Sequence, residues 1–161
     1  MSTETVKANG PKSGLLIGAF DQAFTGSEQY VPIHQRELGA ELMALPTERL
    51  LPGYVAFVAG ANARIARLWS AFVGAAAGDD AVGGELDALQ ERRRADFRAS
   101  VALFRERGLA RRDVDDAELA AALSFLVSPE GYLQLVDEAG WSMDRYQAWL
   151  VDVIERTILA P

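Results

Sequence analysis

The chain has 161 residues, of which 50% are hydrophobic, and its formal net charge is −7 at pH 7. This length fits a single domain that buries about two thirds of its unfolded surface. The absence of cysteine excludes disulfides, zinc–thiolate sites and thiol catalysis. No apolar run reaches the ~18 residues of a membrane span and no signal peptide is visible, so we expect a cytoplasmic protein without a membrane partner.

The first half of the chain has apolar residues at helical spacing and no sustained strand-like alternation. This pattern predicts four helices, over residues 13–24, 34–45, 47–60 and 61–77. Pro46 ends the second of them. Pro52 lies inside the third, which predicts either a kink or a helix start at that position.

The second half continues the helical pattern. A long helix is predicted over residues 84–107, with Gly108 closing it. Asp115 or Asp116 is placed to cap a sixth helix, because an aspartate side chain accepts hydrogen bonds from free backbone N–H groups at a helix start.

The last third of the chain predicts two amphipathic helices joined by a corner. Ser128 is placed to cap the first helix and Ser142 the second. Gly140 stands where a helix ends in a left-handed residue. Trp141 and Tyr146 occupy the two positions of a hydrophobic staple around the Ser142 cap.

Three short motifs in this segment carry a family resemblance. They are Ser128-Pro129-Glu130-Gly131-Tyr132, Gly140-Trp141-Ser142, and Tyr146 followed by Trp149-Leu150. In this order they resemble the closing helices of TetR-family transcriptional regulators. The resemblance implies an all-α, TetR C-terminal-domain-like helical bundle that dimerises through its last two long helices.

The start of the chain resembles the end of a TetR-type helix-turn-helix domain. The matching residues are Thr5, Val6, Pro11, Lys12, Leu15 and Leu16, whereas Lys7 stands where the family usually has tyrosine. The resemblance implies that residues 1–12 are a remnant of the DNA-binding domain, with Thr5 and Lys12 at its DNA-facing positions. Residues 13–161 would then be the ligand-binding and dimerisation domain. About two further helices precede this point in the family, so we expect DNA binding only in a longer form.

Aromatic residues spread over the middle helices are what an apolar ligand pocket requires, although core packing is the simpler interpretation of each one alone. Asn62 is the strongest polar candidate among them, because a buried amide requires a hydrogen-bond partner. The predicted pocket residues are Tyr54, Phe57, Asn62, Trp69, Phe72, Phe97, Phe104 and Phe125.

The last helices carry apolar stripes that must be buried on the protein's own core or on a second subunit. We expect a homodimer that buries them between subunits. The predicted interface residues are Leu119, Leu123, Leu126, Trp149, Leu150, Val153, Ile154 and Ile158.

Enzyme chemistry finds little support in the sequence. The single histidine, His34, favours a capping or surface role over metal binding, because histidine ligands usually occur in clusters. No nucleophile elbow, phosphate loop or dinucleotide motif occurs, so neither a metal nor a cofactor is expected. The basic run Arg92-Arg93-Arg94 has acidic neighbours, which predicts a solvated, salt-bridged helix face.

Together these features predict a TetR-like regulator, with repression the favoured mode, that senses a small apolar effector. The alternative is a stand-alone dimeric helical protein that binds a small hydrophobic molecule without binding DNA. An enzyme built on a helical bundle is a weaker third possibility.

We predict that these 161 residues do not bind specific DNA, because their net charge of −7 repels phosphate. A mobility-shift assay at physiological salt, with random-sequence duplex as competitor, checks this. Saturable and sequence-selective binding would contradict the prediction.

Overall fold

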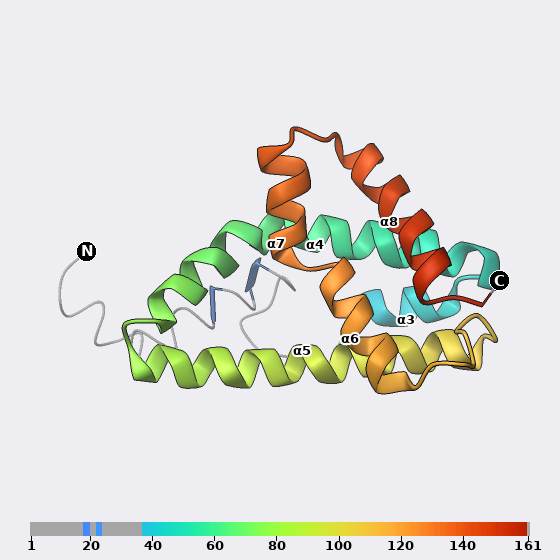
Figure 1. The fold of residues 1–161 in the computed structure, drawn as a ribbon, viewed down its shortest axis with the longest axis horizontal. Coiled ribbons are helices and arrows are strands. Elements are labelled where there is room, and N and C mark those ends of the chain that lie inside the picture. Colours follow the sequence, from blue (N-terminus) through green and yellow to red (C-terminus); the bar gives the residue numbers. More distant parts are fainter. Residues whose placement is uncertain (1–17, 20–21, 24–36, 161) are drawn as a thin grey trace.

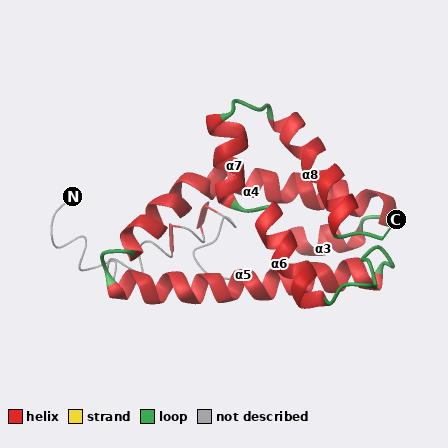
Figure 2. Cartoon of the chain, viewed as in Figure 1, coloured by secondary structure: helices red, strands yellow, loops and turns green. Residues whose placement is uncertain are grey.

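A computed structural model describes residues 18–19, 22–23 and 37–160. Within these residues the fold is all-α, as predicted, and the one β-type feature is an isolated antiparallel bridge between Ala110 and Leu159 (Figure 2). Thr5, Lys12, His34 and the remaining part of the proposed 1–12 remnant lie outside the described residues, as does most of the helix predicted over 13–24.

Two long helices, α4 and α5, form the base of the fold, and the C-terminal helices pack onto them (Figure 1). Helix α6 contacts α5, while α7 and α8 form a hairpin over α4. The elements are α3 (Glu37–Ala44), α4 (Thr47–Ala76), α5 (Asp80–Glu106), α6 (Asp116–Leu126), α7 (Pro129–Tyr132), the π-helical segment η2 (Leu133–Glu138) and α8 (Met143–Thr157).

Helix α4 runs through the predicted boundary between residues 60 and 61, so the prediction of two separate helices there was wrong. A glycine inside a helix costs only about 1 kcal/mol relative to alanine. Burial of Ala59 and Ala61 on either side of Gly60 outweighs that cost. Pro52 also lies inside α4, which excludes a helix start at that position.

Helix α5 starts four residues earlier than predicted, at Asp80 rather than Gly84. The side chain of Asp79 accepts hydrogen bonds from the backbone N–H groups of Ala81 and Val82, at 3.0 and 3.3 Å. This cap starts the helix ahead of Gly83 and Gly84, which lie inside it. Gly108 closes the helix with a φ of 70°, as predicted.

The predicted C-terminal corners are confirmed. Asp115, Ser128 and Ser142 each cap a helix, and their side chains accept hydrogen bonds from backbone N–H groups at 2.8, 3.1 and 3.2 Å, respectively. Gly140 has a φ of 69°. The rings do not pair as the predicted hydrophobic staple: Trp141 contacts Trp149 at a centroid distance of 6.0 Å, and Tyr146 contacts Tyr132 at 5.5 Å.

Two apolar clusters stabilise the fold. The larger joins mainly the first half of α4 to the end of α5 and to α6, α7 and α8. It includes the inner face of the last helix: Tyr146, Leu150, Ile154 and Ile158, all 0% exposed. The smaller joins the second half of α4 to the start of α5: Ile65, Trp69, Phe72, Val82, Leu86 and Leu89. The two clusters meet along α4, which therefore organises the whole core.

One stretch, Asp116–Glu138, is long and apolar enough to cross a membrane by length and composition. This is weak evidence, because buried helices of globular proteins meet the same criterion. The chain also turns within the stretch: α6 ends at Leu126, and Ser128 has the extended backbone of a new helix cap. The described stretch is thus two helices rather than one straight span.

We predict that Ile154→Ala lowers the free energy of unfolding by about 2–4 kcal/mol, because it leaves a cavity at a fully buried position. Val153→Ala on the same helix should cost less than about 1.5 kcal/mol, since Val153 is only half-buried. Urea unfolding followed by circular dichroism checks both. Equal losses for the two variants would contradict the burial of the inner face of α8.

Candidate functional site

A groove of about 450 Å³ lies between α5 and α6, next to the start of α7. Its volume falls within the range of about 300–1,000 Å³ typical of small-molecule sites. Arginine, phenylalanine, alanine and serine side chains dominate its walls. The lining residues are Arg93, Arg94, Phe97, Arg98, Ala117, Ala120, Ala121, Ser124, Phe125, Ser128 and Glu130.

Helical periodicity places these residues along the groove. On α5, Arg93 and Phe97 are four residues apart and so share one face, and Arg94 and Arg98 do the same. On α6, residues 117, 121 and 125 recur at the same interval. The small alanines of α6 leave room beside the long side chains of α5, which opens the groove.

Arg93 is the central polar group of the site. Its guanidinium carbon lies 4.6 Å from the centroid of the Trp69 ring and 5.8 Å from that of Phe97, within the range of cation–π attraction. Removal from water lowers the pKa of Arg93, and the nearby Glu130 carboxylate opposes this shift. Among the described residues, no hydrogen bond or ion pair uses its N–H donors.

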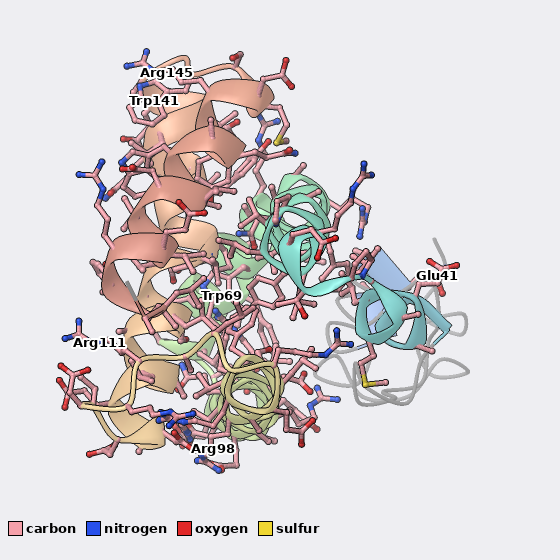
Figure 3. The ribbon with its side chains drawn as sticks, turned by 90° about the vertical axis from the view of Figure 1, so that its right-hand side faces the viewer. Glu41, Trp69, Arg98, Arg111, Trp141 and Arg145 are labelled. Atoms are coloured by element: carbon pink, nitrogen blue, oxygen red, sulfur yellow. The ribbon has the colours of Figure 1, made fainter. Side chains whose placement is uncertain are left out.

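Glu130 fixes the ring on which Arg93 stacks. The Trp69 indole N–H donates a 2.5 Å hydrogen bond to the Glu130 carboxylate. Trp69 is only 4% exposed, and Figure 3 shows it in the space enclosed by the ribbons, whereas Arg98 lies on the outer side of α5. The ring beneath Arg93 is therefore buried and held by a hydrogen bond.

Arg94 and Arg98 both pair with Glu91, at N–O distances of 2.8 and 3.5 Å. The hydrogen bond from Arg94 is the main reason why the pKa of Glu91 is lowered. All three side chains are exposed, so these pairs add little stability and either arginine can turn toward a ligand. The predicted solvated face is confirmed for Arg94 but was wrong for Arg93, which packs against aromatic rings.

Phe125 forms the open edge of the groove. It is 78% exposed, the highest exposure among the large hydrophobic residues described. Covering an exposed phenylalanine with a ligand or a partner removes apolar surface from water, which lowers the free energy of the complex. Phe125 and Phe97 are the two predicted pocket residues that line this groove.

The structure does not gather the other predicted pocket residues into the same site. Tyr54 and Phe104 make an edge-to-face contact at 5.4 Å in the larger cluster, and Trp69 and Phe72 lie in the smaller one. Phe57 joins Tyr54 at a recess of only about 70 Å³ beside α3. Tyr54 lies near the start of α4, whereas Trp69 and Phe72 lie near its end, so they enter different clusters.

The side chain of Asn62 is hydrogen-bonded within the protein. It is 3% exposed, and its side-chain amide donates a 3.0 Å hydrogen bond to the carbonyl of Val127. That carbonyl lies at the C-terminal end of α6, where helix carbonyls lack intrahelical partners. Asn62 therefore anchors the α6–α7 corner and does not line the groove.

The predicted interface residues divide into two groups. Five are buried in the protomer's own core: Leu119, Leu123, Leu150, Ile154 and Ile158. Three are half-buried: Leu126, Trp149 and Val153. The apolar stripes of the last helices could be buried either against a partner or within the subunit. In the structure, α4 and its neighbours cover the larger part of them. A dimer can use only the outer residues without unfolding the core.

Sequence reasoning missed Arg93 and Glu130 as groove residues. The spacing of Arg93 and Phe97 placed them on one face, but the proximity of Trp69 and Glu130 depends on tertiary packing. No group of three acidic or histidine side chains that could hold a metal ion occurs among the residues described.

No protein-family model, curated protein or solved structure matches this chain. The TetR resemblance therefore stays a prediction based on the motifs quoted above.

Proposed function

We propose that this chain is the small-molecule-binding and dimerisation part of a TetR-like transcriptional regulator, acting as a repressor. The observation that carries the ligand-binding part is the α5–α6 groove, which has a suitable volume and an exposed phenylalanine at its edge. The capped corners at Ser128 and Ser142 support the proposed arrangement of closing helices.

In this proposal the effector acts by binding one arrangement of the helices more tightly than another. The groove is suited to that role because its two walls belong to different helices, and α6 is tied by the Ser128 corner to the α7–α8 hairpin. A ligand that alters the spacing of α5 and α6 would move the proposed dimerising helices with them.

The alternative is a stand-alone dimeric helical protein that binds small molecules without acting on DNA. The acidic net charge of −7 favours it. Both functions use the same groove, and they differ in whether ligand binding controls an operator. A cytoplasmic location without a membrane partner belongs to both proposals.

We predict that planar aromatic compounds raise the melting temperature, because a ligand that binds only the folded state stabilises it by mass action. At a concentration 100 times the Kd, this stabilisation is about 2.7 kcal/mol, which is a shift of several degrees for a domain of this size. A thermal-shift screen checks the prediction.

Phe125→Ala should reduce that shift without lowering the melting temperature of the free protein, since Phe125 is exposed. Val73→Ala is the matched control: Val73 is 41% exposed and does not line the groove. A screen without any thermal shift would contradict the proposed ligand binding.

We also predict a homodimer in solution that uses the outer face of α8. Val153→Arg should convert it to a monomer with an unchanged helical spectrum, because the interface would bury an unpaired charge. Ala148→Arg adds the same charge at an exposed position of α8 and should leave the dimer intact. Light scattering at micromolar concentration checks this, and a monomeric unmodified protein would rule the dimer out.

A further inference from the structure

Arg93 combines a fixed position with unused hydrogen-bonding capacity. The ring of Trp69 lies 4.6 Å from its guanidinium carbon, and the indole N–H of Trp69 is itself held by Glu130. A guanidinium has five N–H donors in a planar fork that matches a carboxylate. No described residue accepts a hydrogen bond from that fork, although Arg93 lines the groove.

The charges around Arg93 favour an anion. Three arginines and one glutamate line the groove, so its wall is positive within a chain of net charge −7. Arg93 is half-buried against the rings of Trp69 and Phe97, so water is partly excluded from it. A charge-assisted hydrogen bond is stronger at such a position than on an open surface.

The remainder of the groove favours an aromatic body. Phe97 on α5 and Ala120, Ala121 and Phe125 on α6 line the groove with apolar side chains. Ser124 and Ser128 are the additional small polar groups on the side of α6 and α7. A planar apolar ligand fits between these surfaces more readily than a hydrated sugar or a phosphate-rich molecule.

We infer that the α5–α6 groove binds an aromatic carboxylate, with the carboxylate on Arg93 and the ring against Phe97 and Phe125. This inference rests on the proposed ligand-binding function and refines it, because the sequence predicted an apolar effector and the groove adds a cationic anchor. Arg94 and Arg98 contribute secondary attraction, since Glu91 already partners both. Glu130 opposes the ligand's charge while it orients Trp69.

The test compares 2-naphthoate with 2-naphthamide, which have similar shape and differ in charge, by isothermal titration calorimetry on the intact chain. We expect the carboxylate to bind at least about tenfold more tightly than the amide, as one charge-assisted interaction implies. Arg93→Met should remove this preference, because it weakens carboxylate binding far more than amide binding. Arg93→Lys should retain part of the preference.

Two further variants show whether a lost preference for naphthoate comes from Arg93 itself or from a change in the net charge of the protein. Arg112→Gln removes a positive charge at an exposed position that does not line the groove, and should leave the preference intact. Glu130→Gln keeps an acceptor for the Trp69 indole while removing the negative charge, so it should tighten naphthoate binding. Circular dichroism melts show whether each variant remains folded.

Equal binding of naphthoate and naphthamide would overturn the inference, and so would an unchanged preference in both Arg93 variants. If neither compound binds but a neutral aromatic compound raises the melting temperature, the inference fails and the proposed function survives. If no compound of either kind binds, both fail.

Discussion

The burial of α4 is the constraint on which the rest of the structure depends. Helices α5, α7 and α8 all pack against this one 30-residue helix. Its first half buries Leu50, Val55 and Ala59, and its second half buries Trp69 and Phe72. Because the inner faces of α6 and α8 are needed to complete the first of these clusters, they are not available to a second subunit.

The same packing also creates the groove. Helix α6 lines the groove with the small residues Ala117, Ala120 and Ala121, which leave room beside the long side chains of α5. Trp69 extends from α4 to Glu130 on α7 and supplies the flat surface under Arg93. Arg93 on α5 is thus positioned by Trp69 on α4, which is itself held by Glu130 on α7.

Local signals in the sequence were sufficient to predict the helix ends from Gly108 onward. A cap needs only a suitable side chain and the next three residues, so Asp115, Ser128, Gly140 and Ser142 were identifiable without tertiary information. The false boundary near Gly60 shows the limit of this reasoning, since the cost of a helical glycine is small beside the burial around it.

The candidate site could be predicted only in part. Phe97 and Phe125 were recognised as pocket aromatics, whereas Trp69, Phe72 and Phe104 became core residues because of helix crossings that periodicity does not encode. Arg93 looked like one member of a solvated charge run. Its stacking on Trp69 joins residues 24 positions apart on different helices, which no pattern within α5 contains.

The proposed anchoring of a ligand by Arg93 in the α5–α6 groove can be tested directly on the arginine side chains. The most direct measurement is a ¹⁵N–¹H spectrum of the arginine Nε–H groups during titration with 2-naphthoate. If Arg93 holds the carboxylate, its resonance shows the largest displacement and saturates, with smaller changes at Arg94 and Arg98. A saturating change at arginines outside the groove, with the Arg93 resonance unmoved, would contradict it.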